Sequence, residues 1–439
     1  MHSNEQMIEI HNLGPIKNIK LPIKQFNFLI GEQATGKSTI CKAIYAFDRI
    51  RSQIEALLYR LYSSSEQSIA SFNLRKRLNE KDNRNIIEDI LGFSYYKPQD
   101  LSLIYHITSE KSINISVRKA INTPYIDISF NQLMEDKLSE LVKKHRQLAL
   151  NLNKSDNFDF LMEERSHAFD AIKEDVSKIF ENNEKTYYIP AGRSIFSLFA
   201  GQSAVLDMNS IDLISKEYIK RIELLRHDLS NGLLSYARAF LQENIDENVT
   251  KETNKIDKYI KGKYINRNGV DYLQIGDVMI PMNHASSGQQ EVMWIFNELF
   301  LILLKKEKAF IILEEPEAHI YPRLQLELVK FIAHVVNETG STIFITTHSP
   351  YILTSLNLLC YAGVVAEGKN DTTAVSKLLD GNVLIKPGNV VSVKLEQRGG
   401  ETIAESLLDD NEELKTEMID GVSNTINELY TSLYDLEEK

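Results

Sequence analysis

Short apolar runs that end abruptly in polar residues are the most informative pattern along the chain. Phe28 to Ile30 run into a glycine, and Phe310 to Leu313 run into two glutamates. A third run, Thr342 to Ile345, leads to His348. Runs of this length between polar or turn-forming residues predict buried β-strands. Because parallel α/β sheets gather ligands at the carboxyl ends of their strands, the pattern predicts an α/β fold with a site there.

Elsewhere, the spacing of apolar residues separates predicted sheet from predicted helix. Three segments alternate and predict the antiparallel strands of a side sheet: 101–107, 112–119 and 125–130. Between 132 and 182 apolar residues recur at helical intervals, which predicts an amphipathic helical pair. Residues 205–255 predict the helices of a second lobe, and "YINRNGVDYLQI" predicts a hairpin.

Composition places the chain among globular proteins of a reducing compartment. Its 439 residues exceed what one hydrophobic core usually organises, so we expect a main domain with a substantial lobe or insertion. The net charge of −11 argues against a surface that binds nucleic acid throughout, and leaves a local basic face open. Two cysteines, Cys41 and Cys360, exclude a disulfide framework. Without a signal-peptide pattern or a long uninterrupted apolar run, we expect a cytoplasmic protein that does not span a membrane.

The segment "GEQATGKST" follows the first predicted strand and has the spacing of a phosphate-binding loop. Its glycines let consecutive backbone N–H groups turn toward a phosphate, and the helix that follows adds its dipole. Lys37 then reaches the β and γ phosphates, and the Ser38 hydroxyl binds Mg²⁺. A plain glycine loop is the alternative. The predicted nucleotide-binding residues are Gly31, Gln33, Thr35, Gly36, Lys37, Ser38 and Thr39.

The second predicted strand ends in two adjacent acids, within "AFIILEEPEAHIYP". Glu314 can order Mg²⁺ through water, and Glu315 can polarise the water that attacks the γ phosphate. A solvated acidic loop is the alternative, because Glu is common at surfaces. A lone histidine is usually structural, but His348 is a third polar residue at a strand end, which favours a functional site.

The stretch "ASSGQQE", residues 285–291, has two interpretations. Serine beside glycine is typical of a turn before a helix, where the serine caps free N–H groups of the first turn. The second interpretation depends on the other motifs. Taken in order, "GEQATGKST", "SSGQQE", "LEEPEAHIYP" and "TTHSP" resemble the ABC-type ATPases, and more closely the branch that includes the SMC, RecF and OLD proteins.

The resemblance implies a P-loop NTPase with an ABC-type head: a mixed core sheet flanked by helices, an antiparallel side sheet and a helical lobe. It implies ATP and Mg²⁺ as ligands, and two heads that hold nucleotide between them. By this resemblance Ser286, Gly288 and Gln289 face the ATP bound to the P-loop of a second subunit. The same segment would then be both a helix start and a trans-acting signature.

The resemblance also suggests roles for the strand-end residues. Glu315 looks like the catalytic base, and His348 looks like the switch histidine. Glu314 occupies the metal-linked position, where Asp is usual in ABC ATPases. In "TYYIPAGRS", where the family places its Q-loop, no glutamine occurs; Arg193 is the candidate for nucleotide sensing, and pairing with a carboxylate is its alternative role.

The predicted organisation has four parts: 1–130 with the P-loop, 131–260 as a helical lobe, 261–365 with the signature, the acids and the histidine, and 366–439 as a small extension. Near the start of the extension, "GVVAEGKND" is similar to the opening of a Toprim nuclease, with Glu367 after an apolar strand. No later Asp-x-Asp pair follows, so we do not expect a complete nuclease. The last forty residues have apolar positions at helical spacing, for packing on the head or binding a partner.

Three functional classes fit these motifs. The first is an ATPase that dimerises on ATP and controls an effector such as a nuclease or toxin, as in bacterial antiviral defence. The second is a DNA-repair ATPase whose dimer grips DNA, for which "RKR" at 75–77 and "KKHR" at 143–146 are the basic clusters of note. The third, a transporter subunit, is disfavoured by the large helical insertion.

Overall fold

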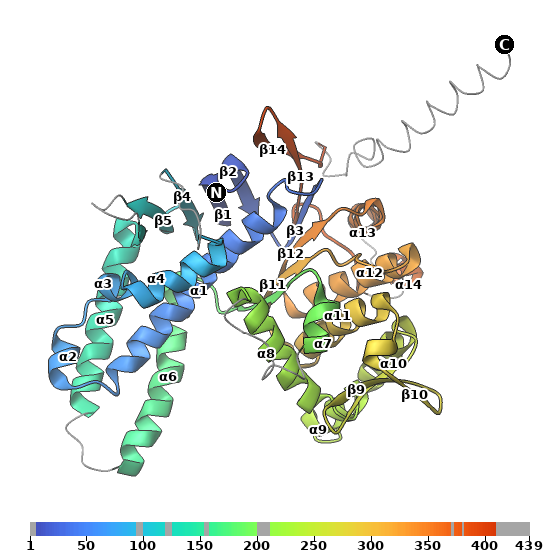
Figure 1. The fold of residues 1–439 in the computed structure, drawn as a ribbon, viewed down its shortest axis with the longest axis horizontal. Helices are drawn as coiled ribbons and strands as arrows, with labels where there is room; N and C mark the ends of the chain where they lie inside the picture. Colours follow the sequence, from blue (N-terminus) through green and yellow to red (C-terminus); the bar gives the residue numbers. More distant parts are fainter. Residues whose placement is uncertain are drawn as a thin grey trace.

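A computed structural model describes residues 6–93, 100–118, 125–152, 158–199, 211–369, 373–379 and 382–409. Figure 1 shows a central sheet, helices on both of its sides, a second sheet above it and a pair of long helices that extends away from the sheets. The predicted α/β class is confirmed. The helical pattern predicted for the last forty residues rests on Leu414 to Leu433, and residues 410–439 lie outside the part of the chain that the structure describes. The described start of this segment is not helical, because residues 401–406 form a β-strand.

The central sheet is mixed and six-stranded, in the order β14-β13-β3-β12-β11-β7. Its strands are β3 (Phe26–Gly31), β7 (Lys185–Ile189), β11 (Ala309–Glu314), β12 (Thr342–Thr347), β13 (Val390–Arg398) and β14 (Glu401–Ser406). All pairs are parallel except the β13–β14 hairpin. Because parallel strands end at the same edge, β3, β11 and β12 bring their polar ends together, as the apolar runs predicted.

The alternation of side chains along these strands separates two hydrophobic cores. Leu29, Ile312 and Phe344 face one core, which the side sheet and α1 (Lys37–Leu61) complete. Phe28, Leu313 and Ile345 face the other, which helices of the second lobe complete. A strand buried on both faces needs apolar residues at every position, which is why these strands are continuous apolar runs rather than alternating ones.

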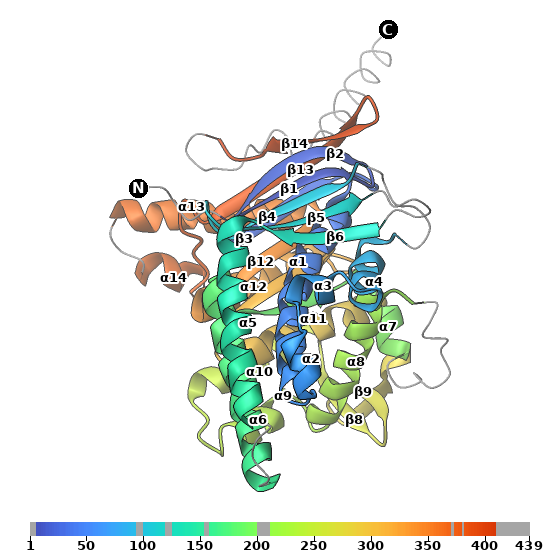
Figure 2. The same cartoon turned by 90° about the vertical axis from the view of Figure 1, so that its left-hand side faces the viewer.

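The side sheet is antiparallel throughout, as predicted, in the order β2-β1-β4-β5-β6. Its strands are β1 (Gln6–Leu13), β2 (Ile16–Ile23), β4 (Ser102–His106), β5 (Ser112–Arg118) and β6 (Tyr125–Phe130). Three short helices follow α1: α2 (Glu66–Ala70), α3 (Leu74–Leu78) and α4 (Lys81–Leu91). The predicted helical pair is α5 (Gln132–Leu152) and α6 (Phe158–Phe180), which extends below the side sheet in Figure 2.

The second lobe lies against the opposite face of the central sheet. Its helices are α7 (Arg193–Phe199), α8 (Leu213–Asp228), α9 (Leu233–Phe240) and α10 (Glu247–Tyr259). The predicted hairpin is β8 (Lys263–Arg267) with β9 (Val270–Ile275), and β10 (Val278–Pro281) adds a third strand. A short 3-10 turn, η2 (Met282–His284), leads into α11 (Ser287–Leu304), and α12 (Pro322–Thr339) follows β11.

The chain after β12 departs from the sequence interpretation. The predicted apolar strand before Glu367 is wrong, because these residues belong to α13 (Pro350–Lys369), which buries Ile352, Leu356 and Leu359 at helical spacing. By length and composition α13 could cross a membrane, and half of its residues from 350 to 368 are buried within the structure. The predicted boundary at residue 365 falls inside α13. After α14 (Thr373–Leu379), β13 pairs with β3 in the central sheet.

Candidate functional site

The phosphate-binding loop connects β3 to α1, and close contacts require both of its glycines. Gly36 has φ +96° at the start of α1, and a Cβ there would lie 2.9 Å from Cγ1 of Ile16. A Cβ on Gly31 would lie 2.3 Å from the carbonyl oxygen of Leu395 in β13. Larger residues at either position would displace neighbouring atoms and distort the loop. The glycines therefore serve the packing of the loop as well as its approach to a phosphate.

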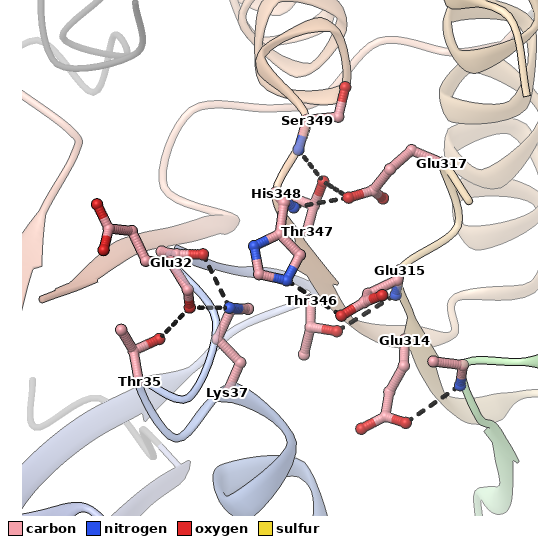
Figure 3. Close-up of polar contacts among 12 residues, drawn as sticks. Glu32, Thr35, Lys37, Glu314, Glu315, Glu317, Thr346, Thr347, His348 and Ser349 are labelled. Atoms are coloured by element: carbon pink, nitrogen blue, oxygen red, sulfur yellow. Dashed lines mark hydrogen bonds and ion pairs between the residues drawn. The ribbon is translucent and has the colours of Figure 1, made fainter. Parts of the chain in front are cut away.

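Lys37 folds back over this loop. Its Nζ donates to the carbonyl oxygens of Gly31 at 2.8 Å and Glu32 at 2.6 Å, and Thr35 Oγ1 donates to the same Glu32 oxygen at 2.9 Å (Figure 3). Burial lowers the pKa of the Lys37 ammonium, while Glu315 and Glu317 oppose that shift. Among the described residues no carboxylate lies within ion-pair distance of Lys37, so its charge remains for an anion.

The remaining predicted loop residues border solvent. Ser38 and Gln33 are exposed, and Thr39 is half-buried. No side-chain hydrogen bond within the described part of the chain engages the Ser38 hydroxyl. This hydroxyl is therefore free to contact a metal ion or a phosphate. Together with the strand before it and the helix after it, the loop has the organisation of a P-loop NTPase.

The two adjacent acids at the end of β11 point in different directions (Figure 3). Glu314 is buried; its Oε1 accepts from the Tyr188 hydroxyl at 2.9 Å and its Oε2 from the Ala191 N–H at 3.2 Å. Burial raises the pKa of Tyr188, and Glu314 adds to that rise, so the hydroxyl stays a donor. Glu315 is more exposed, and its Oε1 lies 3.1 Å from Nε2 of His348.

A third acid of the same segment, Glu317, organises the end of β12, and sequence reasoning missed it. Its Oε1 accepts from Thr347 Oγ1 at 2.7 Å and from the His348 N–H at 2.6 Å. Glu317 thereby fixes the backbone that carries His348. The signal that could have revealed it is the third glutamate of "LEEPE", which lies close to the first two in the sequence.

The signature segment begins a helix, which bears out the first interpretation of "ASSGQQE". Ser286 caps α11: its Oγ accepts from the Gln289 N–H at 3.3 Å, while Gln289 Oε1 accepts from the Ser286 N–H at 3.1 Å. Gln289 Nε2 also donates to the Ile260 carbonyl at 2.9 Å. A Cβ on Gly288 would lie 2.5 Å from the carbonyl oxygen of His319. The two reciprocal bonds between Ser286 and Gln289 form a capping box.

Within one chain, the structure does not connect the signature to the phosphate loop. No hydrogen bond or ion pair in the described ranges joins Ser286, Gly288 or Gln289 to residues 31–39. Ser286 and Ser287 are exposed, so the first turn of α11 is accessible from outside.

Arg193 has the alternative role that the sequence left open. It is fully buried at the start of α7, and its Nε lies 3.2 Å from Oε2 of Glu291 in α11. Its Nη1 donates to the Glu314 carbonyl at 2.6 Å and its Nη2 to the Glu315 carbonyl at 2.9 Å. Because these contacts occupy the guanidinium inside the protein, Arg193 contacts the acidic turn and not a nucleotide directly.

The residues present fit a magnesium ion that arrives with a nucleotide. Among the described residues there is no group of three or more His, Cys, Asp or Glu side chains that could hold a metal ion. Mg²⁺ usually takes one or two protein ligands and completes its shell with phosphate oxygens and water. The exposed Ser38 hydroxyl suits this mode, and each Glu314 oxygen keeps a lone pair beyond the single hydrogen bond it accepts.

Comparison with known proteins places the chain in a family. An Smc head bound to the C-winged helix domain of ScpA has 12% identity and a TM-score of 0.39, over 95% of this chain and 99% of that chain. An SMC head domain from Thermotoga maritima has 7% identity and a TM-score of 0.37, over 93% and 100%. No curated protein matches the chain. A family model described as an AAA ATPase domain matches residues 6–353, so the chain belongs to the AAA ATPase domain family.

Proposed function

We propose that the protein binds ATP with Mg²⁺ on the loop of residues 31–39 and hydrolyses it, with Glu315 as the general base. One observation carries this proposal: the Glu315 carboxylate lies 3.1 Å from His348 and is close enough to Lys37 to act on its pKa. The three groups come from three different elements, which meet at the edge where β3, β11 and β12 end.

The proposed chemistry assigns a separate task to each side chain. Lys37 would move its donors from the loop carbonyls to the β and γ phosphates, a stronger charge-assisted contact. Mg²⁺, held by Ser38 and oriented by Glu314 through water, would neutralise charge that develops on the phosphates. Glu315 would accept a proton from the attacking water, and His348 would orient its carboxylate. Glu317, through the His348 N–H, would keep that histidine in place.

Dimerisation around ATP is part of the proposal. The first turn of α11 is exposed and has no described hydrogen bond to the phosphate loop of its own chain, and by the family resemblance Ser286, Gly288 and Gln289 would act on the nucleotide of a second copy. The helix dipole of this 18-residue helix would favour a phosphate at its start. Control of an effector protein, such as a nuclease or toxin in antiviral defence, is proposed on the family resemblance alone.

The basic clusters give little support to direct DNA binding. In the first cluster Arg75 lies 3.3 Å from Glu135, and Arg77 lies 3.1 Å from Glu80. In the second, Lys144 pairs with Asp175, and Arg146 donates to the Phe72 carbonyl. A cation contributes to DNA affinity by neutralising a phosphate and releasing its counterion. These four side chains already have partners within the chain, so they would have to give up those contacts first.

The experiment that tests the function measures ATP binding and turnover separately. Lys37→Ala should abolish binding, because it removes the charge that holds the β and γ phosphates. Glu315→Gln should bind ATP normally and lose about two to four powers of ten in rate, because an amide accepts no proton from water. Glu140→Gln is the control, since it makes the same replacement at an exposed position of α5, outside the loop. Turnover of Glu315→Gln equal to that of Glu140→Gln would refute the assignment.

A further inference from the structure

Helix α11 carries two buried carboxylates on one face, and each meets a buried or half-buried arginine. Glu291 lies 3.2 Å from Arg193, and Glu298, two turns further along α11, lies 3.1 Å from Arg221. Both glutamates are almost completely buried. A buried carboxylate without a partner is costly, so each pair is needed for α11 to pack at this position. The two pairs differ in what else their arginines contact.

In the first pair, Arg193 also contacts the backbone of Glu314 and Glu315, which we call the catalytic turn. Besides Glu291, the Arg193 guanidinium binds the carbonyl oxygens of Glu314 and Glu315, at 2.6 and 2.9 Å. Glu291 Oε1 also accepts from the N–H and the hydroxyl of Ser194, at 3.2 and 2.7 Å. Glu291 thus fixes Arg193 and its neighbour together, and Arg193 connects the first turns of α11 to the backbone that carries the proposed base.

This contact falls on a strained residue. Glu315 has φ +42°, in the left-handed region that residues with a Cβ seldom occupy. Its N–H donates to the carbonyl oxygen of Thr346 at 2.9 Å, and its own carbonyl accepts from Arg193 Nη2 at 2.9 Å and from the Ala318 N–H at 3.2 Å. A conformation of this kind persists only where surrounding contacts impose it, and it is typical of functional sites. Removing the Arg193 contact would leave the Glu315 carbonyl with only the Ala318 N–H among the described contacts, and would free the turn from its one described side-chain donor at this carbonyl.

The Arg221 pair offers a matched comparison within the same helix. Arg221 Nη2 donates to the Tyr188 carbonyl in β7, at 2.6 Å. Among the described contacts, none joins Arg221 or Glu298 to Glu315. Both arginines therefore pair with a carboxylate of α11 and bond backbone carbonyls. Arg193 bonds those of Pro190, Glu314 and Glu315, whereas Arg221 bonds that of Tyr188 in β7 and none of the turn that carries Glu315.

We propose that Arg193, held by Glu291, is a positioning residue: it orients the Glu315 carboxylate for base catalysis. Because Glu291 lies on α11, the position of the base then depends on the position of that helix. This inference rests on the proposed ATPase function. Arg193 touches neither nucleotide nor attacking water; it acts through the Glu315 backbone. Any shift of α11 would then be transmitted to the base through the Glu291–Arg193 contact.

The test compares conservative variants of the two pairs in the full chain. Arg193→Lys and Glu291→Gln should lower kcat by about 10- to 100-fold, because a small misplacement of a catalytic group has that effect. Their equilibrium affinity for ATP should stay at the wild-type level. Arg221→Lys and Glu298→Gln should lose a similar amount of thermal stability and keep kcat within about twofold of wild type. Equal kcat losses in both pairs, or no loss in Arg193→Lys, would overturn the inference.

A second measurement separates positioning from general damage. In the Glu315→Gln background, Arg193→Lys should cause no further loss of rate, because the base that it positions is already absent. A loss that multiplies with that of Glu315→Gln would contradict positioning. If the proposed ATPase function itself is wrong, the result is different: Lys37→Ala and Glu315→Gln would have the same turnover as the wild-type protein.

Discussion

Asp257, on α10, is a residue whose ionisation opposes folding. Burial raises its pKa to about 6, while Lys263 acts in the opposite direction. The folded protein therefore holds this proton more tightly than the unfolded chain, whose carboxyl titrates near 3.8. Since the folded state binds more protons between these values, stability falls as pH rises from 3.8 to about 6 and stays lower above it.

Asp257→Asn should remove this pH dependence. The variant should gain stability over wild type as the pH rises, reaching about 1 kcal/mol above pH 6 once screening at this half-buried position is allowed for. Urea unfolding at pH 5 and pH 7.5 measures the difference. Asp277→Asn, the same replacement on an exposed turn, is the control. A constant gap between Asp257→Asn and wild type at both pH values would contradict the prediction.

At the scale of elements, the β13–β14 hairpin supports the phosphate loop from the other end of the sequence. Thr402 Oγ1 lies 3.1 Å from the carbonyl oxygens of both Pro15 and Thr35, and Gln397 Nε2 donates to the Ala34 carbonyl at 3.4 Å, across 363 residues. The Leu395 carbonyl is the atom that excludes a side chain at Gly31. The loop geometry therefore depends on a segment that local sequence assigned to a separate extension.

Thr402→Val should test this support. The substitution keeps the shape of the buried side chain and removes its donor, so buried carbonyls lose a partner at a cost of about 1 kcal/mol. If that loss falls on the loop that holds phosphate, ATP binding should weaken by about fivefold. Titration with a fluorescent ATP analogue measures the affinity, and Thr402→Ser, which keeps the hydroxyl, should bind like wild type. Equal affinity in Thr402→Val and Thr402→Ser would argue against a role for the hairpin.

The elements that sequence predicted correctly are those with local causes. The strand, loop and helix around Lys37 follow from adjacent residues, as do the Ser286 cap and the β8–β9 hairpin. The contacts that sequence could not predict join distant segments. Neither the pairing of β13 with β3 nor the Arg193–Glu291 contact has a local pattern, because sheet order and burial decide which segments meet. Glu315 and His348 became candidates because each directly follows a strand, whereas Glu317 lies within a turn.

At the scale of the whole molecule, Ser286 allows the helix-cap role to be separated from a role toward a second copy. Its side chain caps α11 and is exposed, so any replacement that lacks an acceptor loses the cap. Ser286→Ala and Ser286→Arg should therefore both lose about 1 kcal/mol of stability. Only the arginine adds bulk at the position where a second subunit would close on its nucleotide. Both variants thus lose the helix cap, and only Ser286→Arg blocks the approach of a second subunit.

Light scattering in the Glu315→Gln background, which should hold ATP without turning it over, measures the association. With ATP, Glu315→Gln should double its mass, and Ser286→Ala in the same background should still do so. Ser286→Arg should bind ATP and keep the mass of the nucleotide-free species, because steric exclusion prevents closure. If all three proteins show one unchanged mass, the protein is either not a dimer or already a constitutive oligomer, and turnover in an otherwise wild-type chain distinguishes these cases. In a constitutive oligomer Ser286→Arg should abolish turnover, whereas Ser286→Ala, which loses the hydroxyl but adds no bulk, should keep part of it. Equal turnover in both variants, with no ATP-dependent change of mass, would mean that Ser286 serves only as a helix cap.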